Sequence, residues 1–168
     1  MKKINMADPY FTQEDRRWIH IELDKILDGA LSMGPNVKAF ENEFANRIGV
    51  RHAIAMNSCT SSLEAALLAL GATGREVIVP SQTFIASAMA VNLTGGTPVF
   101  AEISASTLCL DLKDVKLKVN NQTAGIILVH MAGMITSDIL DFREFCNNKG
   151  LFLIEDAAHA PGACFGSF

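Results

Sequence analysis

A carboxylate and an imidazole stand close together in the last part of the sequence. An apolar run, Leu151–Ile154, leads into Glu155 and Asp156, and His159 follows shortly after. The run predicts a strand buried on both faces of a parallel sheet, with Asp156 just past its carboxyl end. Ligands of open α/β sheets bind at that edge, where these two groups could hold a heteroaromatic ring. An aspartate in this position can instead cap the next helix, and the stretch alone does not decide between the two interpretations.

Three further segments carry chemically useful groups next to expected strands. Asn57–Ser62 is rich in small hydroxyl residues and opens an expected helix, where backbone N–H groups can bind a phosphate. Ser58 or Thr60 could instead simply cap that helix. Phe84 follows the next strand and could stack on a ligand or pack into the core, and His130 ends a later strand, where a lone histidine is more often structural.

All of these residues follow strands of one predicted sheet. They would therefore meet at its carboxyl edge and offer phosphate donors, an aromatic face, a histidine and a carboxylate to one ligand. The chain contains neither a GxGxxG motif nor a GxxxxGK[ST] motif, so this is not a dinucleotide fingerprint or a P-loop.

Alternating helical and strand patterns must position these groups. Hydrophobic spacing and capping residues predict helices over residues 12–28, 37–48, 60–70, 84–93, 112–119 and 137–149. Short apolar runs predict strands over residues 52–56, 76–79, 98–101, 125–129 and 151–154. This alternation predicts an α/β fold, a three-layer α/β/α arrangement with a mainly parallel sheet.

Composition excludes several classes of protein. The chain has 168 residues, a hydrophobic content of 49% and a formal net charge of −4, and no basic cluster exceeds two residues, which argues against a nucleic-acid partner. No uncharged apolar run is long enough to predict a membrane span or a signal peptide. The four cysteines form no CxxC pair, which predicts reduced, mostly buried thiols in a cytoplasmic protein and no metal site.

Six motifs resemble one known family in order and spacing. The chain is similar to the DegT/DnrJ/StrS-type sugar aminotransferases, pyridoxal-phosphate enzymes of aminotransferase fold type I. The resemblance implies the N-terminal part of a fold type I large domain. The motifs are Gly34–Glu41, Ser58–Leu63, Val79–Ser87, Gly96–Phe100, Val129–Gly133 and Glu155–His159.

The resemblance assigns roles to residues of the predicted edge. Asp156 matches the aspartate that pairs with the pyridine nitrogen of pyridoxal phosphate and keeps it protonated. Phe84 matches the aromatic residue that stacks on the pyridine ring, and His159 matches a position against the phenolic oxygen. The matching phosphate-binding turn, in which many members have glycine at the first position, consists of Cys59, Thr60 and Ser61.

The family's catalytic lysine, which forms the Schiff base with the cofactor, lies after a further strand beyond the aspartate motif. None of the lysines of this chain matches it, so we expect that lysine beyond Phe168. Residues 1–33 are then an N-terminal helical arm, and residues 34–168 are a partial cofactor-binding large domain. By itself such a chain is expected to be inactive.

The resemblance also implies an activity and partners. It implies transfer of an amino group, from a donor such as glutamate, to a keto group on a nucleotide-linked sugar, by a homodimer. Two alternatives stay open. One is a sugar dehydratase of the same family, in which a histidine replaces the lysine, and the other is a non-catalytic remnant.

Overall fold

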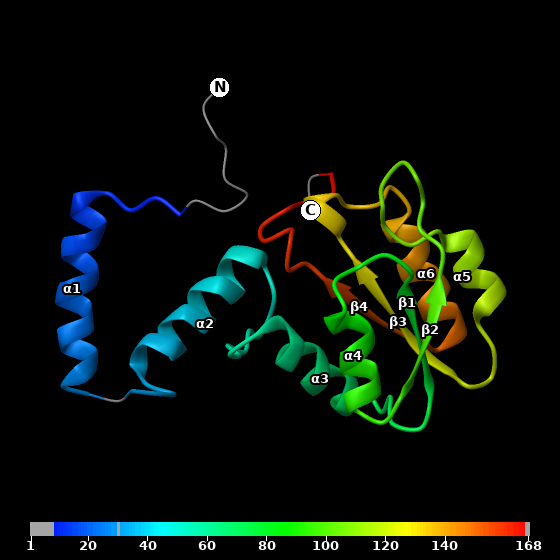
Figure 1. The fold of residues 1–168 in the computed structure, drawn as a ribbon, viewed down its shortest axis with the longest axis horizontal. Coiled ribbons are helices and arrows are strands. Elements are labelled where there is room, and N and C mark those ends of the chain that lie inside the picture. The colour runs from blue at the N-terminus through cyan, green and yellow to red at the C-terminus, as the bar shows by residue number, and fades with distance from the viewer. Residues whose placement is uncertain (1–8, 30, 167–168) are drawn as a thin grey trace. The chain divides into compact units, whose positions relative to one another are not determined.

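The structure, a computed structural model, describes residues 9–29 and 31–166 (Figure 1). The chain forms two compact units that divide between Ala55 and Met56. The second helix thus groups with the first one, and the predicted division into an arm of residues 1–33 and a domain of residues 34–168 stays a prediction.

The first unit contains helices α1 (Gln13–Leu27) and α2 (Pro35–Ile48). Thr12 caps α1 in a capping box, because its hydroxyl accepts the Asp15 N–H while the Asp15 carboxylate accepts the Thr12 N–H. Gly49 ends α2 with a φ of 75°, a left-handed conformation that glycine adopts without steric cost. Both helices were predicted from these caps and from hydrophobic spacing.

The second unit is built on a four-stranded parallel sheet. Its strands lie in the order β2 (Thr97–Ala101), β1 (Glu76–Pro80), β3 (Thr123–Val129) and β4 (Phe152–Asp156). Each matches a predicted strand to within two residues at either end. Asp156 was predicted to lie just past this strand, but it is the last residue of β4, since it pairs in register with Val129.

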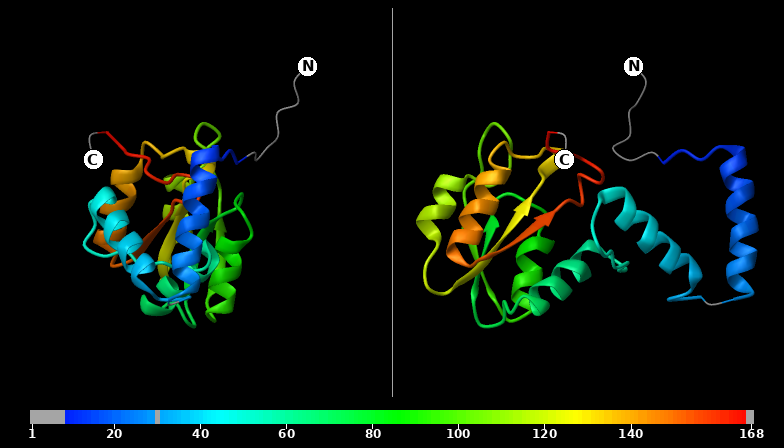
Figure 2. Two further views of the ribbon diagram at one scale, coloured as in Figure 1. Left: turned by 90° about the vertical axis from the view of Figure 1, so that its left-hand side faces the viewer. Right: turned by 180° about the vertical axis from the view of Figure 1, so that it is seen from behind.

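Helices cover both faces of this sheet (Figure 2). One face carries α3 (Cys59–Ala69) and α4 (Ala86–Leu93), and the other carries α5 (Leu112–Lys118) and α6 (Ile139–Lys149). A short 3₁₀ turn, η1 (Met131–Gly133), follows β3. The predicted three-layer α/β/α arrangement with a parallel sheet is confirmed.

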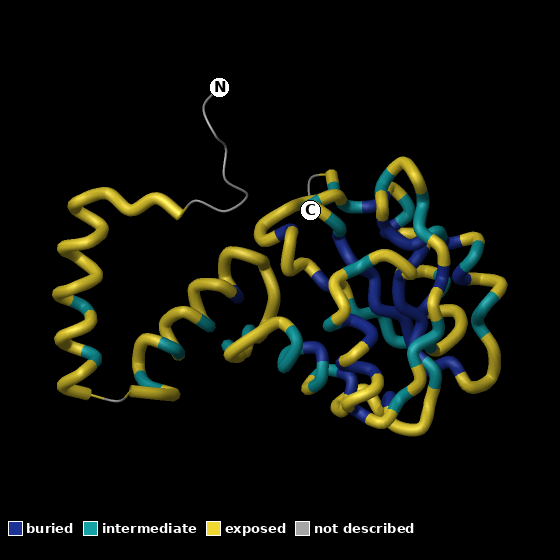
Figure 3. The backbone as a smooth tube through the Cα atoms, in the orientation of Figure 1, coloured by how far each residue is buried: buried dark blue, intermediate teal, exposed yellow. Residues whose placement is uncertain are grey.

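Strand alternation divides the core into two layers. Val77, Val79 and Ile127 pack beneath α3 and α4, whereas Ile78 and Ile126 pack beneath α5 and α6. All are fully buried, and the buried backbone runs along the strands of the sheet in Figure 3. The same alternation points successive residues of β4 to opposite faces.

The prediction of a strand over residues 52–56 is wrong. This segment is irregular, and Ile54 is 78% exposed. The Ala55 N–H donates to the Glu41 side chain at 2.8 Å instead of to a neighbouring strand. A strand needs a hydrogen-bonding partner, and nothing in the described part of the chain pairs with this one.

No helix of the described residues is long and apolar enough to cross a membrane. The four cysteines form no disulfide. Cys109 and Cys146 are buried, whereas Cys59 and Cys164 are exposed, so burial was predicted correctly for two of the four thiols.

Candidate functional site

A cavity of about 120 Å³ lies at the carboxyl edge of the sheet. It is enclosed by the start of α3, the connection from β1 to α4, and the ends of β3 and β4. Ser61 does not line it. The other five predicted site residues do, and they are Cys59, Thr60, Phe84, Asp156 and His159.

Asp156 is the buried charge of this cavity, with 9% of its surface exposed. Its Oδ1 accepts the Ala158 N–H at 3.1 Å and the Cys59 thiol at 3.5 Å, and its Oδ2 accepts the Ser87 hydroxyl at 3.5 Å. Two of these contacts are long, so the carboxylate retains the capacity to accept a stronger bond. Residues 157–166 form turns rather than a helix, so Asp156 is not a helix cap.

The first turn of α3 contributes backbone donors. The Ser58 hydroxyl is the N-cap and accepts the Ser61 N–H at 3.2 Å. Capping was therefore the right interpretation for Ser58, and the Ser61 N–H is occupied by this cap. The N–H groups of Cys59 and Thr60 begin the helix and have no intrahelical acceptor, which leaves them as donors beside the cavity.

Cys59 connects α3 to β4 through its thiol. Burial, and in second place the neighbouring Asp156 carboxylate, raise the pKa of this thiol. The protonated S–H donates to Asp156, so a side chain that the sequence comparison treated only as a departure from glycine has a defined contact here.

Phe84 lies in the connection before α4 and is 72% exposed while lining the cavity. An exposed ring at a cavity wall is not a core residue, so core packing was the wrong interpretation for Phe84. A large apolar side chain left in solvent beside a buried carboxylate provides a surface on which a planar ligand can stack.

His130 has a structural role. It is 3% exposed, and its Nε2 lies 3.1 Å from the Glu155 carboxylate, which points away from the cavity and also accepts the Arg143 guanidinium at 2.7 Å. Hydrogen bonding with His130 lowers the pKa of Glu155 most. Partial burial opposes this shift, but a further hydrogen bond with Arg143 adds to it, and the pKa falls from 4.5 to about 2. Glu155 and Asp156 thus lie on opposite faces of one strand, where Glu155 contacts His130 and Arg143 and Asp156 lines the cavity.

The lowered pKa of Glu155 predicts an acid-sensitive contribution to stability. A carboxyl group whose folded pKa is depressed stabilises the fold above its unfolded pKa of about 4.5 and loses that contribution as the pH falls toward about 2. Its side chain is 31% exposed, so solvent screening reduces the contribution to on the order of 1–2 kcal/mol.

Urea unfolding of the wild type and of Glu155→Gln across this pH range measures the effect. At neutral pH the wild type should have a larger free energy of unfolding than Glu155→Gln. This difference should disappear as the pH falls. Glu144→Gln is the matched control, because Glu144 is exposed and makes no ion pair in the described part of the chain. A gap that stays constant down to the acid limit contradicts the assignment.

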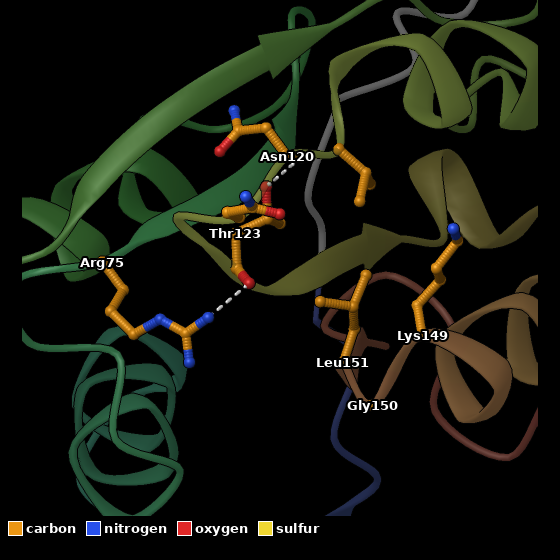
Figure 4. A pocket seen from close by; sticks show the side chains of 8 residues that line it. Arg75, Asn120, Thr123, Lys149, Gly150 and Leu151 are labelled. Carbon is orange, nitrogen blue, oxygen red and sulfur yellow. Dashed lines mark hydrogen bonds between the residues drawn. The ribbon is translucent and has the colours of Figure 1, made fainter.

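A second hollow, of about 350 Å³, lies at the opposite edge of the sheet (Figure 4). Arg75, Asn120 and Lys149 contribute to its wall. The Arg75 guanidinium donates to the Thr123 carbonyl at 2.7 Å, and the Asn120 amide donates to the Glu76 carboxylate at 2.8 Å. These polar groups hold the amino ends of the strands together, and Lys149 lies here, away from Asp156.

Comparison with known proteins shows the family to which the chain belongs. The sequence profile of the DegT/DnrJ/EryC1/StrS aminotransferase family matches residues 14–166. The chain belongs to this family. The predicted family, a family of aminotransferases, is confirmed.

Three known proteins illustrate what this chain is similar to. GDP-perosamine synthase of Vibrio cholerae is 38% identical over 95% of this chain and 43% of its own length. DesV of S. venezuelae, a solved structure, is 38% identical over 89% of this chain and 41% of its own, with a TM-score of 0.85. NtdA of Bacillus subtilis, solved with bound cofactor PMP, is 32% identical over 90% of this chain and 35% of its own, with a TM-score of 0.84.

The chain spans less than half the length of these relatives. The predicted cofactor, pyridoxal phosphate, is confirmed for the family, since NtdA carries the pyridoxamine form. The roles assigned to individual cofactor-binding residues of this chain stay predictions.

Sequence inspection missed two residues of this aminotransferase-family site. Ser87 is 1% exposed, and its hydroxyl lies 3.5 Å from Asp156 and 3.4 Å from the Thr83 hydroxyl, which also lines the cavity. A usable signal was present, because Ser87 is a polar residue buried in the otherwise apolar start of α4. A buried hydroxyl requires a partner, and that partner is the site carboxylate.

Proposed function

We propose that this chain provides the cofactor-binding part of an aminotransferase that moves an amino group from a donor such as glutamate to a keto group on a nucleotide-linked sugar. One observation carries the proposal. A buried carboxylate with spare acceptor capacity, Asp156, shares a cavity with the exposed ring of Phe84 and with the free N–H groups at the start of α3. Pyridoxal phosphate presents the complementary groups, namely a basic ring nitrogen, a flat ring and a phosphate.

Each part of the site has a separate task in this proposal. Asp156 holds a proton on the pyridine nitrogen, because an adjacent carboxylate favours the charged form of that base. Phe84 supports the ring by stacking. The phosphate would be held at the positive end of the α3 dipole by the N–H groups of Cys59 and Thr60 and by the hydroxyls of Thr60 and Ser61, because the Ser61 N–H is engaged by Ser58.

The bound cofactor supplies an electron sink for the reacting carbon. The described residues prepare for that chemistry in two ways. Burial of Asp156 beneath α3 and α4 keeps its carboxylate largely out of water, which strengthens its interaction with a pyridinium. The Ala158 N–H and the Ser87 hydroxyl orient the carboxylate.

The name of one relative supports the proposed substrate class, and exposed apolar surface of this chain supports the proposed assembly. The name of GDP-perosamine synthase contains a nucleotide and a sugar, which supports a nucleotide-linked sugar as substrate. We also propose a homodimer. Apolar side chains of α1 such as Trp18, which is 63% exposed, offer surface for association, and light scattering that shows only monomer at high concentration would contradict it.

Titration of the chain with pyridoxal phosphate, followed by fluorescence, tests the proposed function. We expect saturable binding of pyridoxal phosphate. Pyridoxal, which lacks the phosphate, should bind with lower affinity. Phe84→Ala should weaken binding by about 2- to 13-fold, because ring stacking contributes about 0.5–1.5 kcal/mol. Phe100→Ala is the matched control, since Phe100 is a 51% exposed ring that does not line the cavity.

Two outcomes contradict the proposal. One is the absence of saturable binding, and the other is an equal loss of affinity in the Phe84 and Phe100 variants. Since no lysine lines the cavity among the described residues, we also expect borohydride to fix no cofactor at a single lysine of this chain.

A further inference from the structure

The loops that follow β3 and β4 are joined by two hydrogen bonds. The His130 N–H donates to the Asp156 carbonyl at 3.0 Å, which extends the pairing of the two strands by one step. Beyond it, the Ala132 N–H donates to Nδ1 of the His159 ring at 3.3 Å. A backbone group of one loop therefore holds the ring of the other at the cavity wall.

The backbone adopts an unfavourable conformation to make this contact. Ala132 has φ 54° and ψ 25°, a left-handed conformation that residues with a Cβ rarely adopt. Gly133 follows with φ 84°, and a Cβ at that position would lie 3.1 Å from the His159 carbonyl oxygen. Strain of this kind persists only where the surroundings enforce it, and it often accompanies function.

The contact also determines where the imidazole carries its proton. An N–H that donates to Nδ1 needs a lone pair there, so the neutral ring must carry its proton on Nε2. His159 then presents an N–H donor rather than an acceptor at its other ring nitrogen, at the wall of the cavity that also holds Asp156.

We propose that Ala132 is a positioning residue that holds His159 in the Nε2–H tautomer, so that the ring donates a hydrogen bond to an oxygen of the bound ligand. The tautomer follows from the contacts of this chain alone. The identity of that oxygen, the phenolic oxygen of pyridoxal phosphate, rests on the proposed function.

The tautomer is tested by NMR on the chain without added cofactor, with ¹⁵N-labelled histidine, at a pH above the range in which histidine normally titrates. We expect a single Nε2–H pattern at His159 and tautomer mixtures at the exposed His20 and His52, which serve as internal references. The Ala132 amide should exchange slowly with deuterium. His159→Asn keeps an acceptor near the Nδ1 position and should retain that protection, whereas His159→Ala should lose it.

A titration with pyridoxal phosphate tests the positioning role. Ala132→Gly keeps the N–H and tolerates a positive φ, so it should lose less affinity than Ala132→Val. Ala132→Val places a branched side chain at a positive φ and should weaken binding by about 5-fold, the effect of one typical hydrogen bond. The same change in a His159→Ala background should have no further effect on affinity.

The two experiments separate the inference from the proposed function. Failure of pyridoxal phosphate to bind the wild type overturns the proposed function, while the NMR result still decides the tautomer. Mixed tautomers at His159 together with rapid exchange of the Ala132 amide overturn the inference. An equal loss of affinity on Ala132→Val with and without His159 overturns the positioning role, and the wild-type NMR result stands even where the valine variant does not fold.

Discussion

Asp156→Asn is expected to weaken the binding of pyridoxal phosphate by roughly 10- to 150-fold. A hydrogen bond between a carboxylate and a pyridinium is charge-assisted and contributes about 1.5–3 kcal/mol. Asparagine retains an oxygen that can accept the Ala158 N–H and the Cys59 thiol, so the substitution removes charge while preserving the turn. Asp156→Ala removes both the charge and the accepting oxygen, and this variant should bind the cofactor at least as weakly as Asp156→Asn.

Glu155→Gln is the control for this experiment. It makes the same chemical change one residue earlier in β4, on the face that contacts His130 and Arg143. It should lower stability at neutral pH and leave cofactor affinity unchanged. Fluorescence titration and urea unfolding of both variants therefore separate binding from stability. Equal losses of affinity at the two positions would show that Asp156 acts only through the fold.

Gly125→Ala is expected to destabilise the second unit by on the order of 3 kcal/mol, the upper part of the usual range for overpacking a core. Gly125 lies in β3 directly opposite Phe152 of β4, and the ring of Phe152 lies across it. A Cβ at Gly125 would overlap that ring, so either the ring or the strands β3 and β4 must shift. A glycine inside a strand commonly marks such a close approach.

A double-mutant cycle with Phe152→Ala tests this steric explanation by urea unfolding. When the ring is absent, Gly125→Ala should be close to neutral, which gives a coupling of about 2 kcal/mol or more. Gly29→Ala is the control, because a Cβ there meets only ordinary contacts, the nearest at 3.5 Å. A Gly125→Ala cost that persists without the ring would instead point to an effect on the strand itself.

Features that depend on neighbours in the chain could be predicted from the sequence. The capping box of Thr12 and Asp15 lies within one turn, and Gly49 ends a helix by its own conformational freedom. The parallel sheet followed from apolar runs such as residues 125–129, which are buried along their whole length. Five of the six predicted site residues line one cavity, because carboxyl ends of parallel strands must share an edge.

Only the tertiary structure decided features that depend on residues distant in the chain. Residues 52–56 have strand-like composition, but pairing requires a partner that composition does not supply. Cys59 and Asp156 are 97 positions apart, and Ser87 and Asp156 are 69 apart, so their contacts depend on how α3 and α4 pack on the sheet.

The same distinction separates the protein's two histidines at this edge. Both follow strand ends, and the sequence by itself determined only that His130 and His159 would lie near the site. His130 is buried against Glu155, whereas His159 lines the cavity with its Nδ1 bound by the Ala132 N–H. The direction of a side chain at the end of a strand depends on the loop packed beside it, and that loop takes its shape from a left-handed residue that tertiary contacts impose.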